Sequence, residues 1–244
     1  MKRKKLLTII GITVAALLLG AVLVGVLNAL VAGGSWNFGW TDYRYDESGY
    51  QIGDGSVNAT ELSEIDVDWI DGEVRIVLCQ DACVSLSESS EKSLSEDSLL
   101  RYRISEDGKR LSVKYRKSSW YFGNSKNKEK TLILRIPEHM IESGQLKKLK
   151  IKGISANVTV DGTPFMENGS VRFAPEQISV ETKTGNIKLI LPRDASFALK
   201  FDSKKDLKPT VDFSYQRQNG QYICGEGSMK INITSKSGKL LVTH

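Results

Sequence analysis

Histidine is nearly absent from this chain of 244 residues, which contains only His139 and His244. A Ser-His-Asp triad needs a histidine beside its nucleophile, and a multi-histidine metal site needs several on neighbouring segments. Neither arrangement can be assembled convincingly from these two positions. We therefore expect no catalytic residue, no metal site and no cofactor, and we do not expect an enzyme.

An excess of charge of one sign is also missing once the amino terminus is set aside. The chain has 34 Lys and Arg against 29 Asp and Glu, and four of the basic residues are Lys2, Arg3, Lys4 and Lys5. Without those four the count is 30 against 29, a balance of +1. A nucleic-acid-binding domain usually has a strongly basic face. We expect no nucleic-acid partner.

A helical period is lacking from residue 57 onward, where apolar and polar residues alternate in short runs. Examples are IDVDWI at 65–70, EVRIVL at 73–78, LSVKY at 111–115 and TLILRI at 131–136. Period-two alternation is typical of half-buried strands. A helical turn is expected only within 138–149, with Gly144 ending it. The exterior part is therefore expected to be all-β.

One long apolar run stands apart from this pattern. Residues 6–32 contain no charged side chain, and about 20 apolar residues suffice to cross a bilayer as a helix. A cleaved signal peptide is the alternative, but its apolar region is about 7 to 15 residues long and its cleavage site needs an A-x-A-like arrangement. Leu30 stands two positions before Ala32. We expect an uncleaved transmembrane helix over 6–32.

The basic start sets the orientation of this helix. Lys and Arg favour the cytoplasmic side, so residues 1–5 are expected in the cytoplasm and residues 33–244 outside it. Residues 33–56 are rich in glycine and lack a hydrophobic period, which predicts a juxtamembrane linker. The expected product is a single-pass protein of the cell membrane with an extracytoplasmic domain over 57–244.

Small residues recur at four-residue spacing within the apolar run, at Ala21, Gly25 and Ala29. Such a stripe lets two membrane helices approach closely. The alternative is the ordinary enrichment of Gly and Ala in membrane helices.

A short phrase occurs twice, as VETKTGNIKL at 180–189 and ITSKSGKLLV at 233–242. Aligning the chain on four small central residues, Gly72, Ala156, Gly185 and Gly238, extends the phrase to four units. The residues seven and five before each centre and two and four after it are apolar in all four units: Ile65, Val67, Val74, Ile76, Leu149, Ile151, Val158, Val160, Ile178, Val180, Ile187, Leu189, Ile231, Ile233, Leu240 and Val242.

This register predicts a strand, a tight turn whose central residue tolerates positive φ, and a second strand returning to the same core. Each unit buries one narrow stripe and needs its neighbours for stability. Stacked units predict an irregular β-solenoid or β-roll, because the spacings of 84, 29 and 53 residues between centres leave room for insertions. An ordinary β-sandwich is the alternative.

With these four units the chain resembles the bacterial putative-adhesin family, whose function is unknown. The residues that carry the resemblance are IDVDWIDGEVRI at 65–76, LKIKGISANVTV at 149–160, ISVETKTGNIKLILP at 178–192 and GEGSMKINITSKSGKLLV at 225–242. The resemblance implies an all-β, solenoid-like exterior domain, often behind a membrane helix, without established catalytic residues. The sequence departs from the family at Ala156, which replaces the turn glycine, and at the following position, where the frequent Asp is Glu73, Asn157, Asn186 or Lys239.

Two motifs suggest chemistry that their context does not favour. Lys183-Thr184-Gly185 matches the K-T-G of penicillin-recognising serine enzymes, but Lys236-Ser237-Gly238 occupies the same slot of the repeat. Asp66, Asp68, Asp71 and Glu73 could hold Ca²⁺ through oxygen ligands, although the solvated face of two strands explains them as well.

Three cysteines are present. Cys79 and Cys83 flank a three-residue connection, and outside the cytoplasm such a pair can form a disulfide. Cys224 is then left over unless it pairs with one of these two, and the alternative is that all three remain free thiols.

The segment 115–130 combines flexible positive charge with large rings. Its members are Arg116, Lys117, Trp120, Tyr121, Phe122, Lys126, Lys128 and Lys130. Such a segment suits an anionic surface, because the cations reach phosphate groups while the rings enter a headgroup layer or stack on sugar. The alternative is a hairpin whose rings fold back onto the sheet.

Two functions fit these expectations. One is a membrane-anchored envelope protein presenting a non-catalytic, adhesion-like binding module that contacts cell-wall polymer or an anionic lipid surface. The other is a regulatory subunit that acts through a membrane regulatory protein in an envelope-stress response.

Overall fold

The computed structural model describes residues 40–122, 130–163, 173 and 175–244. Within these ranges nearly all regular structure is strand, with one short 3₁₀ helix and one short α-helix, so the all-β prediction is confirmed. The chain divides into two compact units, Met1–Arg44 with Ser119–Ser125 and Tyr45–Ser118 with Lys126–His244.

The described part of the first unit is a two-stranded antiparallel sheet. Strand β1 (Trp40–Tyr43) pairs with β9 (Ser119–Phe122), with Trp40 opposite Phe122 and Tyr43 opposite Ser119. The expected linker over 33–56 therefore contains regular structure, since β1, β2 (Gln51–Ile52) and the start of β3 (Gly55–Asn58) all fall inside it. Glycine-rich composition concealed these strands because each is only two to four residues long.

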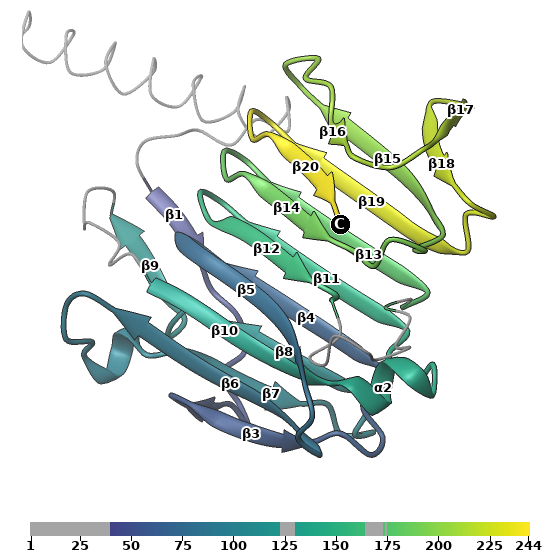
Figure 1. Ribbon diagram of the computed structural model, residues 1–244. Helices are drawn as coiled ribbons and strands as arrows, with labels where there is room; N and C mark the ends of the chain where they lie inside the picture. The colour runs from purple at the N-terminus through teal and green to yellow at the C-terminus, as the bar shows by residue number, and fades with distance from the viewer. Residues whose placement is uncertain (1–39, 123–129, 164–172, 174) are drawn as a thin grey trace, which may run out of the picture. The chain divides into compact units, whose positions relative to one another are not determined.

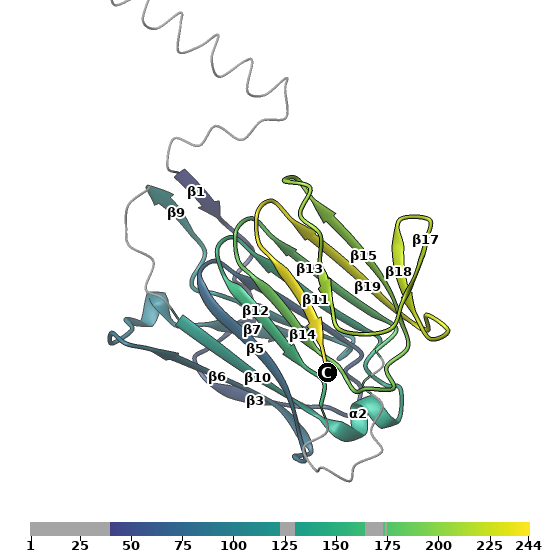
Figure 2. The ribbon, with the colours of Figure 1, turned by 45° about the horizontal axis from the view of Figure 1, so that its top comes forward.

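The second unit consists of two mixed sheets that form two layers (Figures 1 and 2). The eight-stranded sheet has the order β16-β20-β14-β12-β5-β10-β6-β3, and the ten-stranded sheet has the order β17-β18-β15-β19-β13-β11-β4-β8-β7-β2. Neither order returns to its first strand, so both sheets are open.

Four consecutive strand pairs carry the repeated units, with the first strand of each pair in the ten-stranded sheet and the second in the eight-stranded sheet. The pairs are β4 (Glu64–Trp69) with β5 (Gly72–Cys79), β11 (Lys148–Gly153) with β12 (Asn157–Asp161), β13 (Gln177–Thr182) with β14 (Ile187–Ile190), and β19 (Met229–Ser235) with β20 (Leu240–Thr243).

The predicted register of these units is confirmed at every position. Leu149 lies opposite Ile65 on one side and Ile178 on the other, and Ile178 lies opposite Ile231. The other three columns of apolar residues align in the same way across parallel strands. All sixteen side chains are buried. Because each buried aliphatic side chain contributes about 1.5–3 kcal/mol relative to exposure, these columns form the centre of the core.

Two further pairs extend the stack; the sequence predicted strands in these segments but not their place beside the four repeated units. Strand β8 (Arg110–Lys114) lies beside β4, and β10 (Lys130–Pro137) lies beside β5. At the other end, β15 (Phe197–Ser203) lies beside β19, and β16 (Thr210–Val211) lies beside β20. Both pairs have long or irregular connections, which hid them from an alignment on short turns.

Antiparallel strands extend both sheets at one end of the stack and only the ten-stranded sheet at the other end, where β16 is the edge of the eight-stranded sheet. Beyond β8 and β10 lie β7 (Arg101–Ile104), β2, β6 (Cys83–Ser90) and β3, with the 3₁₀ helix η1 (Glu96–Ser98) between β6 and β7. Beyond β15 lie β18 (Gln221–Cys224) and β17 (Gln216–Gln218).

The predicted helical turn is α2 (Glu138–Glu142), which follows β10 directly and buries Met140 and Ile141. Gly144 has φ of 64°, and the helix ends before it as expected. Among the residues that the structure describes, no helix is both long and apolar enough to span a membrane. The expected transmembrane helix over 6–32 lies outside the described residues.

Candidate functional surfaces

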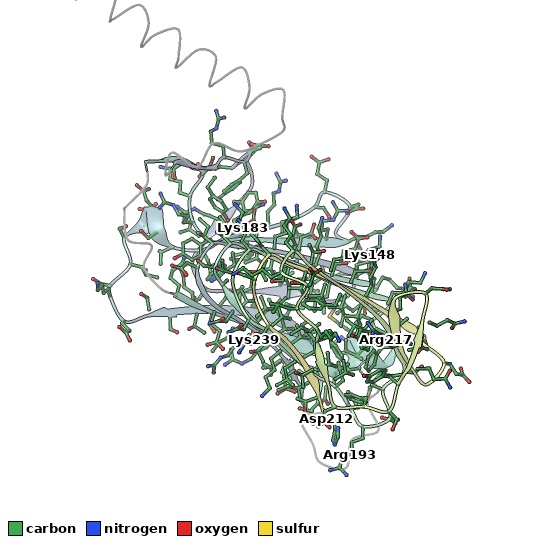
Figure 3. All side chains as sticks on the ribbon, turned by 90° about the horizontal axis from the view of Figure 1, so that it is seen from above. Lys148, Lys183, Arg193, Asp212, Arg217 and Lys239 are labelled. Carbon is green, nitrogen blue, oxygen red and sulfur yellow. The ribbon has the colours of Figure 1, made fainter. Side chains whose placement is uncertain are left out.

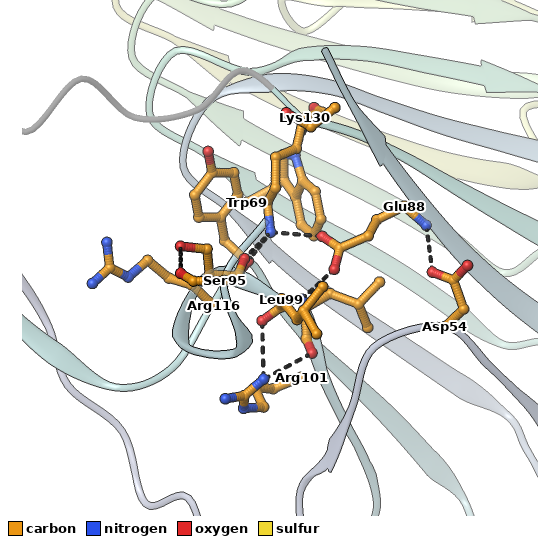
Figure 4. A network of polar contacts seen from close by, with 12 residues as sticks. Asp54, Trp69, Glu88, Ser95, Leu99, Arg101, Arg116 and Lys130 are labelled. Atoms are coloured by element: carbon orange, nitrogen blue, oxygen red, sulfur yellow. Dashed lines mark hydrogen bonds and ion pairs between the residues drawn. The ribbon is translucent and has the colours of Figure 1, made fainter. Parts of the chain in front are cut away.

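Lys130 does not belong to an exposed binding segment. It begins β10, its side chain is 1% exposed, and its Nζ lies 2.7 Å from Oε2 of Glu88, whose side chain is 3% exposed (Figure 4). The ammonium group also donates to the carbonyl oxygens of Ser98 and Tyr115. The prediction that Lys130 reaches an external anion is therefore wrong, because its buried ammonium group already has three acceptors within the protein.

Two aromatic rings complete the surroundings of this ammonium group. Nζ of Lys130 lies 4.8 Å from the ring centroid of Trp69 and 4.2 Å from that of Tyr115, and the two rings meet edge to face. Burial lowers the pKa of Lys130 to about 8, although the hydrogen bond that Lys130 donates to Glu88 opposes this shift. Glu88 in turn accepts the backbone N–H of Leu100 at 2.7 Å. The cluster joins β4, β6 and β10 with Tyr115, the residue that follows β8, inside the stack.

The rest of the predicted segment 115–130 is divided. Arg116 is half-buried, and its carbonyl oxygen accepts the hydroxyl of Tyr45 at 2.6 Å. Lys117 is exposed and pairs with Asp97 at 3.3 Å. Trp120, Tyr121 and Phe122 lie on β9 and not in a loop. Lys126 and Lys128 lie outside the described residues, as do the candidate helix-pairing residues Ala21, Gly25 and Ala29.

All three cysteines are free thiols in the structure. Cys79 ends β5 opposite Pro137 of β10, and Cys83 begins β6 on the far side of β10. Two strand spacings of about 4.8 Å separate such positions, whereas a disulfide needs Cα atoms within about 7 Å. The expected Cys79–Cys83 disulfide is absent for this reason. Burial raises the pKa of Cys79, and it raises that of Cys224 to about 11.

The repeated phrase forms corners where a strand of one sheet passes into the other. Thr182 and Ser235 are buried, and their hydroxyl oxygens accept the N–H groups of Gly185 at 3.1 Å and Gly238 at 2.7 Å. A buried N–H without a partner is costly, so each hydroxyl satisfies its own corner. Lys183-Thr184-Gly185 is thus part of a structural corner.

The central glycines are required for two different reasons. Gly72 has φ of 87°, which confirms the expected positive φ at that turn. Gly185 and Gly238 do not have positive φ, and here the expectation is wrong. A Cβ atom on Gly185 would collide with the carbonyl oxygen of Ala156, and one on Gly238 would collide with that of Gly185. Close approach of the neighbouring corner excludes a side chain at both positions.

The acidic residues near the first turn pair with neighbouring strands. Asp68 binds Lys114 at 2.9 Å, and Asp66 lies 3.8 Å from Arg110. Glu64, in the same strand, contacts Arg110 at 2.8 Å and Lys148 at 2.9 Å. Hydrogen bonds donated by Lys148 and, to a smaller extent, by Arg110 lower the pKa of Glu64.

The remaining two acids of that turn also have local partners. Asp71 accepts the hydroxyl of Ser155 at 2.8 Å, and Glu73 pairs with Arg75 at 2.8 Å. No group of three metal-ligating side chains occurs within the ranges that the structure covers. Partners on neighbouring strands or in the turn account for these acidic residues, as expected for the solvated face of paired strands.

A row of three exposed lysines crosses the corners at the other end of the stack. Each lysine directly follows the last residue of a strand: Lys183 follows β13, Lys236 follows β19 and Lys204 follows β15. The backbone N–H of Lys236 donates to the carbonyl oxygen of Thr182, and that of Lys204 donates to the carbonyl oxygen of Ser235, both at 3.2 Å. We call these three residues the lysine corner; Figure 3 labels Lys183. The repeat revealed Lys183 and Lys236, but Lys204 could not be found because its unit lacks the phrase.

A shallow groove lies next to the corner, on the outer face of β12, β14 and β20, with a volume of about 360 Å³. Its wall includes a ladder of amides: Asn157 accepts the N–H of Asn186, and Asn186 accepts the N–H of Lys239, both at 3.0 Å. Lys188 and Lys239 line the same groove and are exposed (Figure 3, Lys239).

Comparison with solved structures gives a fold likeness. The structure titled as a putative cell adhesion protein from Clostridium sporogenes ATCC 15579 matches with a TM-score of 0.54 and 12% identity, over 80% of this chain and 98% of that one. A putative adhesin from Bacteroides fragilis NCTC 9343 is 11% identical over 79% of this chain and 96% of that one, but a TM-score of 0.22 is too low to indicate a shared fold.

No family model matches the sequence, and no curated protein does. At 12% identity the first match establishes a shared fold and nothing further about this chain.

Proposed function

We propose that the chain is a membrane-anchored, non-catalytic binding module of adhesion-like type, displayed on the outer side of the cell membrane. The observation that carries this proposal is the repetition of outward-facing chemistry in straight rows. One row contains Lys183, Lys236 and Lys204, and another contains Asn157, Asn186 and Lys239. Rows of equal spacing on a rigid frame suit a ligand that is itself repetitive.

The frame is best interpreted as an irregular β-solenoid. Six strand pairs stack side by side, each with one strand in either sheet, and their buried columns are continuous. Solenoids bury a core by stacking units that are unstable alone, and they offer long surfaces for binding. The antiparallel end strands then serve as caps. The fold likeness to a structure titled as a putative cell adhesion protein supports this interpretation.

The anchor rests on the sequence. Residues 6–32 lack charge and follow four basic residues, which favours a membrane helix with its amino terminus in the cytoplasm. The described domain would then face the cell envelope, where a repetitive wall polymer is within reach.

Limited proteolysis of whole cells after removal of the wall tests the placement. We expect an external protease to digest residues 45–244 while a cytoplasmic control protein stays intact. Incubation of the detergent-solubilised chain with isolated, protein-free wall fragments tests the binding, and we expect it to sediment with them. Protection of the domain from protease would refute the placement, and failure to sediment with the fragments would refute the wall-binding function.

A further inference from the structure

The lysine corner concentrates positive charge in a way that folding does not require. The three lysines follow adjacent parallel strands, so their backbones repeat at about 4.8 Å. Like charges on directly neighbouring strands destabilise a sheet. The two preceding corners have Ile70 and Ile154 at the same position in the row, which shows that this fold accepts uncharged residues there.

Acidic partners are missing from this row but present elsewhere on the same domain. Lys114, Lys147 and Lys148 pair with Asp68, Glu176 and Glu64 at 2.7–2.9 Å. Within the described ranges, Lys183, Lys204 and Lys236 have no carboxylate within 4 Å. Their charge is therefore available to an external anion.

The neighbouring groove adds donors beside the same corners. Lys239 and Lys188 contribute two more exposed ammonium groups, and Thr210 contributes a hydroxyl. Asn157 and Asn186 use their side-chain oxygens as acceptors within the ladder, so that the NH₂ groups of both amides are not consumed by it. The amide NH₂ groups, the ammonium groups and the threonine hydroxyl all can donate to phosphate oxygens.

We propose that the lysine corner and this groove bind a linear polymer of phosphate groups that lies along the stack of strands. The inference rests on the proposed binding function and specifies its ligand class. A row of cations at strand spacing matches a chain of regularly spaced anions, and lysine binds phosphate as a point charge.

A lipid surface fits the site less well. Peripheral membrane binding combines cations with apolar side chains that enter the bilayer. Of the large hydrophobic residues that the structure shows exposed, Ile52, Ile104 and Tyr215 belong to other strands or loops, and only Leu241 lines the groove. The lysines themselves are flanked by Thr184, Ser237 and Lys205.

The test uses the full chain in non-ionic detergent and fluorescently labelled long-chain inorganic polyphosphate as probe. The variant K183Q/K204Q/K236Q is compared with K150Q/K152Q/K230Q, which removes the same charge from exposed lysines on the outer face of the ten-stranded sheet. We expect the corner variant to weaken binding at least tenfold and the control variant to weaken it less than threefold. Equal weakening by both variants, or none by either, would overturn the proposal.

Salt and competitors sharpen the result. Binding should weaken as salt screens the charges, and the corner variant should lose part of that salt dependence. Orthophosphate at the same phosphate concentration should compete poorly, because it cannot span the row. If the corner substitutions abolish binding to anionic phosphatidylglycerol vesicles but leave polyphosphate binding intact, the site recognises lipid and the proposal is wrong.

Two controls separate this proposal from its premises. Urea midpoints of both variants that are no lower than that of the wild type show that the substitutions leave the fold intact, and relief of like-charge repulsion should keep or raise the midpoint of the corner variant. Polyphosphate binding by a domain that proteolysis places inside the cell would refute the proposed location while leaving the site intact. Wall binding that survives in the corner variant would refute the site while leaving the general function intact.

Discussion

The ammonium Nζ of Lys130 lies 2.7 Å from the carboxylate Oε2 of Glu88, and both side chains are almost completely buried. Lys130 stands opposite Gly72 in the column of corner positions that elsewhere contains Ala156, Gly185 and Gly238. A charged residue thus occupies a position that the other corners fill with small ones. The buried pair is a structural feature of the first strand pair in the stack.

Removing one partner should destabilise the protein strongly. Lys130→Met leaves the buried carboxylate of Glu88 and the carbonyl oxygens of Ser98 and Tyr115 without their shared donor, and removing one partner of a buried pair costs about 3–5 kcal/mol. The double variant Lys130→Met/Glu88→Gln removes both charges and should recover part of that loss. Urea denaturation of the full chain in detergent measures the free energies of unfolding of the wild type, of Lys130→Met, of Glu88→Gln and of the double variant. Additive effects of the two single substitutions would contradict the coupling.

The pH dependence of stability should reflect the lowered pKa of Lys130. Its pKa is about 8 in the folded protein and about 10.4 in an unfolded chain. Between these values the unfolded state binds more protons, so the stability contributed by Lys130 rises with pH. At about 1.4 kcal/mol for each pH unit, the wild type should gain up to about 3 kcal/mol over Lys130→Met/Glu88→Gln between pH 7.5 and 10.5. A constant or shrinking difference in unfolding free energy would argue against this assignment.

The second corner glycine should not tolerate a methyl group. Gly185→Ala places Cβ against the carbonyl oxygen of Ala156, and we expect a loss of about 3 kcal/mol from overpacking. Gly144→Ala is the control, because it has φ of 64° with nothing within 4 Å of the added atom and should cost only about 1 kcal/mol of backbone strain. Thermal or urea unfolding compares the two. Similar losses would show that contact with the neighbouring corner is not the reason for Gly185.

The hydroxyl of Ser235 should matter although its side chain is small. Ser235→Ala removes the acceptor of the N–H of Gly238 in a fully buried corner, and an unsatisfied buried donor costs about 1–3 kcal/mol. The half-buried neighbour Ser237 provides the control substitution Ser237→Ala. Its hydroxyl makes only a long hydrogen bond, 3.4 Å, to the carbonyl oxygen of Lys183, so we expect its loss to change the unfolding free energy by less than about 1 kcal/mol. A neutral Ser235→Ala would show that water replaces the hydroxyl.

Thiol mapping addresses the cysteines. Because β10 separates the strands of Cys79 and Cys83, alkylation of the denatured, unreduced protein should modify all three cysteines. Recovery of a Cys79–Cys83 disulfide peptide would require this end of β5 to move.

Local pattern determined a large part of the fold. The sixteen apolar residues of the four repeated units, beginning with Ile65 and Val67, stand two positions apart within each strand. This period of two follows from strand geometry and from the burial of one face of each strand. The register therefore followed from the sequence, as did the helical turn ended by Gly144 and the need for small residues at the corners. The apolar run over 6–32 is equally local, and its assignment as a membrane anchor remains a prediction from the sequence.

Only the tertiary structure decided the order of the strands. The pair β8 and β10 lies before β4 and β5 in the stack, and β15 and β16 lie beyond β19 and β20, so spatial order departs from chain order at both ends. Such pairings depend on long-range packing that no local period encodes. For the same reason, the sequence pattern predicted an exposed position for Lys130. It also gave no sign that a strand lies between Cys79 and Cys83, or that Lys204 lies beside Lys183 and Lys236. Burial of a charge and the meeting of distant corners are decided by which strands become neighbours.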